Sequence, residues 1–178
     1  MGCVNLIVLI AQLTLASSIA FSSAPPLAPA SVDSAKAAAS PPTAALMAFK
    51  KAIRAKYDLK EMAFAEHDAE TIVTKFYAED VISVGENEGI FVGRDQIRPL
   101  YAEVVKTNHV KIDSVHTYVN GSAGWDWADF YVTPTDGKTK PFTFAILFLW
   151  SKVHGEWICK GDYFMTGSFR GGKLGAGT

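Results

Sequence analysis

Acidic and aromatic side chains alternate in the segment GWDWADFYV, where Asp126 and Asp129 flank Trp127. Successive side chains of a strand point to opposite faces, so Asp126 lies on one face, and Asp129 lies on the other with Trp125 and Trp127. A carboxylate beside aromatic rings can act as a general base when an apolar pocket raises its pKa. The pattern predicts that one of the two carboxylates lines a pocket, and it leaves open which face that is.

Two further residues could take part in proton transfer. Asp162 stands in the last apolar segment of the chain, either as a base in an apolar pocket or as a solvated aspartate at the rim of a sheet. Tyr57 lies in the middle of an apolar helical stripe, where its hydroxyl could donate a hydrogen bond to a substrate oxyanion or simply end at the pocket rim. Lys60 lies at the edge of the same stripe, and we expect it in solvent.

Other motifs of enzyme sites are missing from the sequence. The 4 His residues have no metal-ligand spacing, and no Gly-rich phosphate loop, serine nucleophile elbow or dinucleotide fingerprint occurs. We therefore expect neither a metal nor a cofactor. Cys159 is left alone once Cys3 is removed with the leader, and its place in a strand indicates packing rather than nucleophilic attack.

The composition is that of a globular domain with a full core. The chain has 178 residues, of which 49% are hydrophobic, and its formal net charge is -1. Without an excess of basic residues we expect no nucleic-acid partner, and the balance favours an uncharged or small ligand.

The beginning of the chain is predicted to be targeting and linker sequence. Residues 1–20 resemble a signal peptide, because the apolar run Val4 to Ile19 is shorter than the ~20 residues of a membrane span and small residues precede a cleavage point after Ala20. Residues 21–42 are rich in Ala, Pro and Ser, which predicts a disordered linker or a transit-like segment. We expect a secreted or periplasmic protein without a membrane span after signal cleavage. The alternative is a plastid protein, since Phe after the cleavage point is typical of algae with complex plastids.

Periodicity predicts helices first and strands after them. An apolar stripe at helical spacing predicts a first helix over residues 43–66. Asp68 can cap a second helix over residues 69–77, the acidic residues 78–80 should form a turn, and Gly93 opens a third helix. Strands separated by turn residues are expected over residues 81–86, 89–92, 109–119, 123–133, 140–153 and 156–167.

This order predicts an α+β fold. It would be cone-shaped, with three N-terminal helices packed on a strongly curved, mostly antiparallel sheet of about six strands. The domain is expected over residues 43–170, followed by a flexible Gly-rich tail over residues 171–178. The segment 142–150 is almost entirely apolar, so both faces of its strand should be covered, one by helices and the other by a candidate second subunit.

The stretch from Phe64 to Tyr101 resembles the start of the nuclear transport factor 2-like superfamily, in particular its SnoaL-like branch. The resemblance covers residues 43–168, and it rests on the Asp-capped second helix, the acidic residues before the first strand, Gly-Arg before the third helix, and Trp157 followed by Asp162. It implies a half-open cone with an apolar pocket, used for proton transfer or for binding a small hydrophobic molecule. It also implies a homodimer formed through the sheet face.

The resemblance adds roles for single residues. In SnoaL-like cyclases a catalytic Asp follows a Trp in the last strand, about four residues on, whereas Asp162 follows Trp157 by five; a bulge at Gly161 would restore its facing. In related dehydratases and dehydrohalogenases a His at the start of the third strand, here His109, pairs with an Asp near the end of the first helix. At that helix position this chain has the run Glu66-His67-Asp68, which leaves the pair ambiguous.

Two activities known for this fold are disfavoured. The base of ketosteroid isomerases falls near Gly85, their helix-one Tyr falls near Lys60, and their second acid falls in the apolar segment 144–148. Metal-free carbonic anhydrases end their last strand in His-His-Ser-Ser, whereas this chain continues from Asp162 with Tyr, Phe and Met.

These observations predict a SnoaL-like protein that moves a proton on a small apolar or aromatic carbonyl compound, as an isomerase, cyclase or lyase. One alternative is a protein that binds a lipid, pigment or other hydrophobic molecule without chemistry, and a second is a structural dimerisation module. The candidate catalytic residues are Asp162, Asp126, His109 and Tyr57. The candidate ligand-binding residues are Trp125, Trp127, Tyr163, Phe64 and Tyr101.

Overall fold

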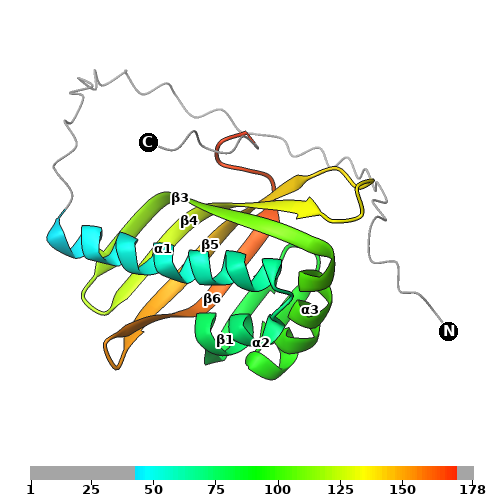
Figure 1. Cartoon of the computed structure of the whole chain (residues 1–178). Coiled ribbons are helices and arrows are strands. Elements are labelled where there is room, and N and C mark those ends of the chain that lie inside the picture. Colours follow the sequence, from blue (N-terminus) through cyan, green and yellow to red (C-terminus); the bar gives the residue numbers. More distant parts are fainter. Residues whose placement is uncertain (1–42, 172–178) are drawn as a thin grey trace, which may run out of the picture. The chain divides into compact units, whose positions relative to one another are not determined.

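A computed structural model describes residues 43–171 (Figure 1). The predicted signal peptide, the predicted linker and most of the predicted Gly-rich tail lie outside these residues. The helices are α1 (Ala44–Ala65), α2 (Ala69–Thr71), which continues as a π-helical segment (Ile72–Phe76), and α3 (Arg94–Thr107). The strands are β1 (Tyr77–Gly85), β2 (Gly89–Val92), β3 (Asn108–Asn120), β4 (Ala123–Pro134), β5 (Phe142–Val153) and β6 (Glu156–Thr166).

The strands form one open six-stranded sheet in the order β2-β1-β6-β5-β4-β3. β1 and β6 are parallel, and all other neighbours are antiparallel. α1 crosses one face of this sheet, and α2 and α3 lie beside the C-terminal end of α1 (Figure 1). The predicted α+β class and the cone of three helices on a mostly antiparallel sheet are confirmed. We call the sheet face toward α1 the inner face and the opposite one the outer face.

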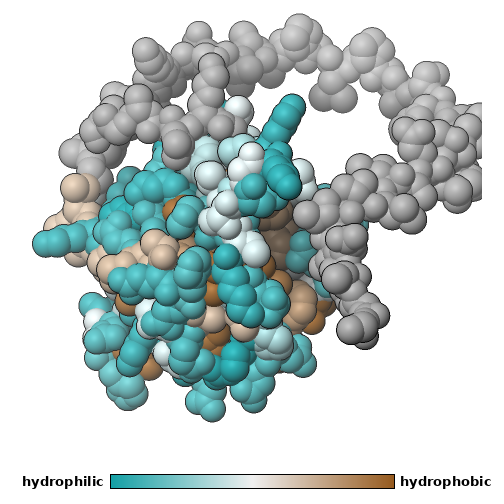
Figure 2. All heavy atoms as spheres, turned by 45° about the vertical axis from the view of Figure 1, so that its right-hand side comes forward, coloured by the Kyte–Doolittle hydropathy of each residue, from teal (hydrophilic) through white to brown (hydrophobic). Residues whose placement is uncertain are grey.

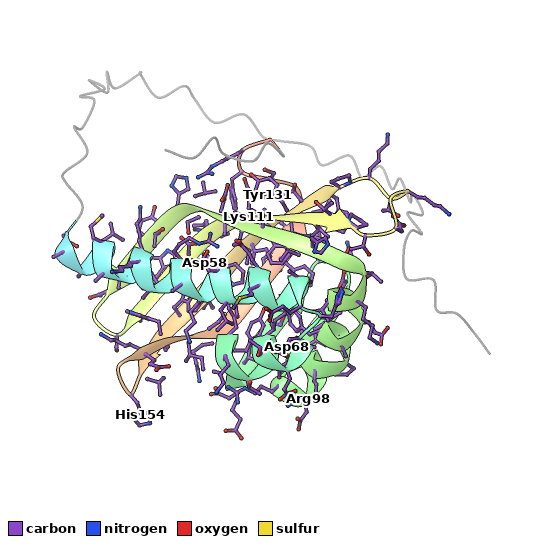
Figure 3. All side chains as sticks on the ribbon, viewed as in Figure 1. Asp58, Asp68, Arg98, Lys111, Tyr131 and His154 are labelled. Atoms are coloured by element: carbon purple, nitrogen blue, oxygen red, sulfur yellow. The ribbon has the colours of Figure 1, made fainter. Side chains whose placement is uncertain are left out.

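Side-chain caps set the helix boundaries that the sequence predicts. The Thr43 hydroxyl accepts a hydrogen bond from the Leu46 amide at 3.2 Å, and the Asp68 carboxylate accepts one from the Thr71 amide at 2.9 Å. Each cap satisfies an amide that has no partner within its helix. Figure 3 shows Asp68 at the junction between α1 and α2.

α1 is held on the sheet by its apolar stripe and by one carboxylate. Its buried large side chains are Phe49, Ile53, Tyr57, Lys60 and Phe64. Each large apolar side chain contributes roughly 1.5–3 kcal/mol when it leaves water. Glu61 adds a polar link, because its carboxylate accepts hydrogen bonds from the β3 amide of Ile112 at 2.9 Å and from Lys111 at 2.8 Å. Lys111 is labelled beside α1 in Figure 3.

The acidic residues 78–80 do not form a turn, which corrects one expectation. They belong to β1, which starts at Tyr77 rather than at residue 81. Tyr77 pairs with Cys159 and Ile82 pairs with Gly161, so β1 carries a large bulge between its two paired ends. At this bulge, the Tyr77 carbonyl accepts two hydrogen bonds from the Arg94 guanidinium, at 2.6 and 3.1 Å.

The outer face is partly covered by the C-terminal end of the described chain. Asp129 is fully buried there, and it accepts hydrogen bonds from the amides of Phe169 at 2.7 Å and Arg170 at 3.1 Å. Other outer-face side chains stay exposed, among them Leu149 at 47% and Trp125 at 39%. The expected cover on both faces of β5 is therefore incomplete within residues 43–171.

Polar residues cover most of the face seen in Figure 2, with hydrophobic residues emerging between them. Within residues 43–171, no helix is both long and apolar enough to cross a membrane.

Candidate active site inside the cone

A buried lysine lies at the centre of a polar network inside the cone. Lys60 of α1 is 1% exposed, and its Nζ donates hydrogen bonds to the hydroxyls of Tyr77 and Tyr101, each at 2.8 Å. These two hydroxyls are 2.7 Å apart. Tyr77 in turn donates to Asp162 at 2.5 Å. The lysine and the carboxylate are thus joined through one phenol, and each compensates for the buried charge of the other.

Asp162 faces the interior because β6 contains a bulge. Leu149 of β5 pairs with Gly161, but the next residue of β5, Trp150, pairs with Cys159, so Lys160 is an extra residue. A shift of one residue turns a strand side chain to the opposite face. Asp162 therefore lies on the same face as Trp157, whose ring packs against Phe49 of α1 with centroids 4.5 Å apart.

Neighbouring elements orient the Asp162 carboxylate. Ser83 of β1 is opposite Asp162 in the parallel β1–β6 register, and its hydroxyl donates to the second carboxylate oxygen at 2.6 Å. Tyr77 is positioned by Arg94, which binds the Tyr77 carbonyl and also the Thr74 carbonyl at 2.9 Å. Both carboxylate oxygens thus accept a hydrogen bond from a side chain on β1.

Aromatic rings surround the Lys60 amine. Its Nζ lies 4.3 Å from the ring centroid of Phe76, 4.7 Å from that of Tyr77 and 4.9 Å from that of Tyr101. The negative face of an aromatic ring attracts a cation, which partly replaces the lost water. Burial nevertheless lowers the pKa of Lys60 to about 8, and the charge of Asp162 opposes this shift. Burial raises the pKa of both Tyr77 and Tyr101 well above its usual value, so both phenols stay protonated at neutral pH.

Asp126 also faces the interior but belongs to a second network. It lies on β4 with no exposed surface, and it accepts hydrogen bonds from Tyr57 at 2.7 Å, Ser114 at 2.8 Å and Thr117 at 2.6 Å. Burial raises the pKa of Asp126, and the hydrogen bonds from Thr117, Tyr57 and Ser114 act against this. Burial likewise raises the pKa of Tyr57. The Asp126 carboxylate therefore accepts its hydrogen bonds from side chains of α1 and β3.

The structure divides the remaining candidate residues between the two faces. Phe64 and Tyr101 are at the interior site, and their rings make an edge contact with centroids 6.2 Å apart.

Trp125, Trp127 and Tyr163 lie on the outer face. There Trp125 stacks on Tyr118, and Trp127 packs against Phe169. The sheet thus separates these three aromatic residues from Asp162 and Asp126, so they do not line a common pocket.

His109 is also away from the interior. It is exposed at the beginning of β3. Its neighbour Val110 packs against the core, so the alternation of the strand turns the His109 side chain to the outer face. At the end of α1, His67 and Asp68 have other partners: the His67 ring contacts the Val105 carbonyl at 2.6 Å, and Asp68 caps α2.

Sequence reasoning missed three members of the interior network, namely Lys60, Tyr77 and Ser83. The expectation that Lys60 is in solvent was wrong. Its position was readable from spacing, because Lys60 stands three residues after Tyr57 and four before Phe64, which fills the only wide gap in the apolar stripe. Tyr77 and Ser83 gave no such signal, since their partner Asp162 is 85 and 79 residues away along the chain.

One surface depression of about 260 Å³ lies outside this network. It is lined by Ala78, Glu79, Asp80, Val153, Glu156, Ile158 and Lys160. Lys160 and Asp80 form an ion pair there. Within residues 43–171, no group of three or more His, Cys, Asp or Glu side chains is arranged to hold a metal ion.

Comparison with protein-family models and with curated proteins found no match. Solved structures do match. A nuclear transport factor 2-like superfamily protein from Salmonella enterica is 19% identical, with a TM-score of 0.59, covering 74% of this chain and 99% of that one. A ketosteroid isomerase-like protein from Erwinia carotovora is also 19% identical, with a TM-score of 0.55 and coverages of 66% and 95%.

A third similar structure is a putative calcium/calmodulin dependent protein kinase II association domain from Xanthomonas campestris. It is 16% identical, with a TM-score of 0.56, and the match covers 66% of this chain and 86% of that one. At such identities the likeness concerns the fold, and activity has to be argued from the site itself.

Proposed function

We propose that this chain, which has the fold of the nuclear transport factor 2-like superfamily, is an enzyme that moves a proton on a small apolar or aromatic carbonyl compound. The observation that carries the proposal is the chain of contacts from Lys60 through Tyr77 to Asp162 within an aromatic interior. Networks that keep titratable groups in apolar surroundings are frequent at active sites. The SnoaL-like branch stays a prediction, and the likeness to a ketosteroid isomerase-like protein is compatible with this chemistry.

Asp162 is the proposed general base. Ser83 and Tyr77 hold one carboxylate oxygen each, and this fixes the orientation of the carboxylate. It would take the proton from a carbon next to the substrate carbonyl. Return of that proton to another carbon gives isomerisation, and reaction of the resulting enolate with a second carbon gives cyclisation; the reverse of that bond formation is a lyase reaction.

Tyr101 is the proposed hydrogen-bond donor to the substrate oxygen. It is the one member of the network that is only partly buried, whereas Lys60, Tyr77, Ser83 and Asp162 are buried. The raised pKa of its phenol keeps the proton on the hydroxyl, as a donor to a developing oxyanion requires. Lys60, which is 2.8 Å from the Tyr101 hydroxyl, supplies positive charge behind it.

Asp126 and Tyr57 are assigned to the stability of the fold. The Asp126 carboxylate already accepts three side-chain hydrogen bonds, from α1 and from β3, and these bonds tie the helix to the sheet. Breaking such an interaction leaves a buried polar group without a partner, which costs about 1–3 kcal/mol.

The test is exchange of substrate hydrogen for deuterium. The purified protein is incubated in D₂O with a panel of small aromatic and alicyclic ketones and aldehydes, and incorporation next to the carbonyl is followed by NMR. Asp162→Asn should reduce the rate by about 10²–10⁴-fold, the contribution typical of a positioned general base. Asp58→Asn is the matched control, since Asp58 is exposed on α1 (Figure 3). Exchange at the wild-type rate in a folded Asp162→Asn protein would end the assignment.

A structural dimerisation module is the second candidate, and the outer face favours it. The exposed apolar side chains Ile82, Trp125, Leu149 and Tyr163 lie on strands that are neighbours in the sheet, at exposures between 39% and 50%. A contiguous apolar patch of this kind indicates an interaction surface. The two candidate functions are compatible, since they use opposite faces of the sheet.

A further inference from the structure

Lys60 has a position that the proposed proton transfer does not by itself require. Lysine is among the residues that are least often fully buried, yet this side chain is 1% exposed and its amine is enclosed by rings and phenols. An oxyanion could be held by Tyr101 alone. A buried amine in apolar surroundings is the arrangement that activates lysine as a nucleophile toward carbonyl groups.

We propose that Lys60 Nζ attacks the carbonyl carbon of the substrate and forms an imine with it. This inference rests on the proposed function and names its substrate class, an aldehyde or a ketone. A carboxylic ester or amide is excluded, because attack by an amine there ends in a stable amide instead of a reversible imine. The amine lone pair makes the new C–N bond and the C=O electron pair moves to oxygen. One N–H proton then passes to this oxygen through the Tyr101 hydroxyl, which gives a neutral carbinolamine.

The neighbours of Lys60 fit the proton movements of the next steps. Tyr101 is 2.8 Å from Nζ, so its hydroxyl can donate a proton to the carbinolamine oxygen, which leaves as water. The nitrogen then carries the charge of a protonated imine. Asp162 takes the proton from the adjacent carbon, and the electron pair of that C–H bond forms the enamine. Asp162 then returns the proton to carbon, which re-forms the protonated imine. One water molecule adds to the imine carbon and gives a proton back to Tyr101, and the resulting carbinolamine collapses to the carbonyl product as its O–H proton passes to the Lys60 nitrogen.

The burial of Lys60 also provides the reactive form of the amine. An amine attacks only when it is unprotonated, and an ordinary lysine is almost entirely protonated at neutral pH. With a pKa of about 8, roughly a tenth of the Lys60 side chains are unprotonated at about pH 7. Tyr77 keeps Asp162 one hydroxyl away from the amine, so the pair is close without a direct ion pair that would hold the proton on nitrogen.

The test is reductive trapping followed by mass spectrometry. The full chain is incubated with phenylacetone, a small aromatic ketone that carries hydrogens next to its carbonyl, in the presence of sodium cyanoborohydride. We expect one adduct per chain, located at Lys60 by peptide mapping, with a trapping rate that rises with pH around a midpoint of about 8. Lys60→Arg should lose this adduct, and Lys56→Arg, on the same helix with its amine on the Lys75 carbonyl, should keep it.

Further variants separate this inference from the proposed function. Asp162→Asn should still be trapped at Lys60 while losing deuterium exchange, since it can form the imine but cannot take the carbon-bound proton. Deuterium exchange at the wild-type rate in folded Lys60→Arg would overturn the proposal that Lys60 is a nucleophile. It would leave the proposed proton transfer by Asp162 intact. An adduct at Lys60 without any exchange would uphold the nucleophile and end the proton-transfer proposal. If Lys60→Arg does not fold, adducts on surface lysines alone in the wild-type protein overturn the inference.

Discussion

Two carboxylates face the interior from the same row of the sheet, and their neighbours give them different roles. Asp126 is paired with Phe148, and Phe148 is paired on its other side with Asp162, so one aromatic strand residue separates the two. Asp126 has donors from Tyr57, Ser114 and Thr117 and no exposed surface. Asp162 is linked to a buried amine instead. The identity of the donors, rather than burial alone, distinguishes a structural aspartate from a candidate base.

The titration of Lys60 should be visible in the stability of the protein. Burial lowers the pKa of Lys60 from 10.5 in the unfolded chain to about 8 in the folded one. Between these values the folded state binds fewer protons, so the free energy of unfolding rises with pH; this contribution is complete above the unfolded pKa and is lost as the pH falls through the folded one. Lys60 by itself should contribute a gain of roughly 2 kcal/mol from about pH 7 to about pH 9.5, measured as the difference between the wild-type protein and a variant without this amine.

Chemical denaturation at a series of pH values measures this gain. Lys60→Met has no titrating amine at this position and should lack the rise, whereas Lys56→Met should keep it. Burial also raises the pKa values of Cys159, Tyr77 and Tyr101, so ionisation of these groups in the unfolded chain acts in the opposite direction toward the upper end of this range. The wild-type protein and both variants share that effect, so the difference between their curves reports Lys60. Parallel curves for the wild-type protein and Lys60→Met would contradict a lowered pKa.

At the scale of elements, irregularities in β1 and β6 build the site. The extra residue Lys160 turns Asp162 inward, and the bulge in β1 brings Tyr77 and Ser83 to the same carboxylate. Gly161 lies where these two strands meet. A Cβ there would be 2.7 Å from the Ile82 carbonyl oxygen, so only glycine lets β1 and β6 approach this closely.

Replacement of Gly161 tests this close approach. Gly161→Ala should push β1 away from β6 and lower the free energy of unfolding by about 1–3 kcal/mol, as overpacking typically does. It should also reduce deuterium exchange, because Ser83 and Tyr77 would shift relative to Asp162. Lys160→Ala is the control: it removes only an ion pair with Asp80 at the surface, worth at most about 1 kcal/mol. Equal stability of the two variants in thermal and denaturant unfolding would show that the contact is unimportant.

At the scale of the whole molecule, the two faces of the sheet have different tasks. The inner face carries both polar networks under α1. The outer face carries exposed apolar side chains, and beside them lies the C-terminal segment around Phe169, whose amide donates a hydrogen bond to Asp129. Leu149 lies between Trp125 and Gly161 in the register, in the middle of the sheet. A second copy of this chain, packed on this face, would complete the cover over β5 that its apolar composition predicts.

We therefore expect Leu149→Glu to give a monomer where the wild-type domain gives a dimer. Burial of an unpaired charge in the contact should weaken association by about 2 kcal/mol or more, which is over tenfold in the dissociation constant. Light scattering coupled to size exclusion measures the mass. Met47→Glu is the control, because Met47 is 55% exposed on α1, away from the sheet face. A monomeric wild-type protein would rule out the dimer.

The sequence by itself determined the order of elements, because caps, apolar periodicity and turn residues act over a few positions. The first helix was predicted over residues 43–66, and α1 runs from Ala44 to Ala65 with Thr43 as its cap. The same local signals misassigned residues 78–80, where an acidic run looks like a turn, although pairing of Tyr77 with Cys159 draws it into a strand.

Only the tertiary structure decided which side chains meet. The facing of Asp126 followed once α1 covered one side of β4. The facing of Asp162 depends on a one-residue bulge, which was expected at Gly161 and lies at the preceding residue, Lys160. Lys60 was within reach of sequence reasoning, since it completes the helical stripe, but its charge argued for solvent. Its burial is possible because Tyr77, Tyr101 and Asp162 come together around it, from three elements that are distant along the chain.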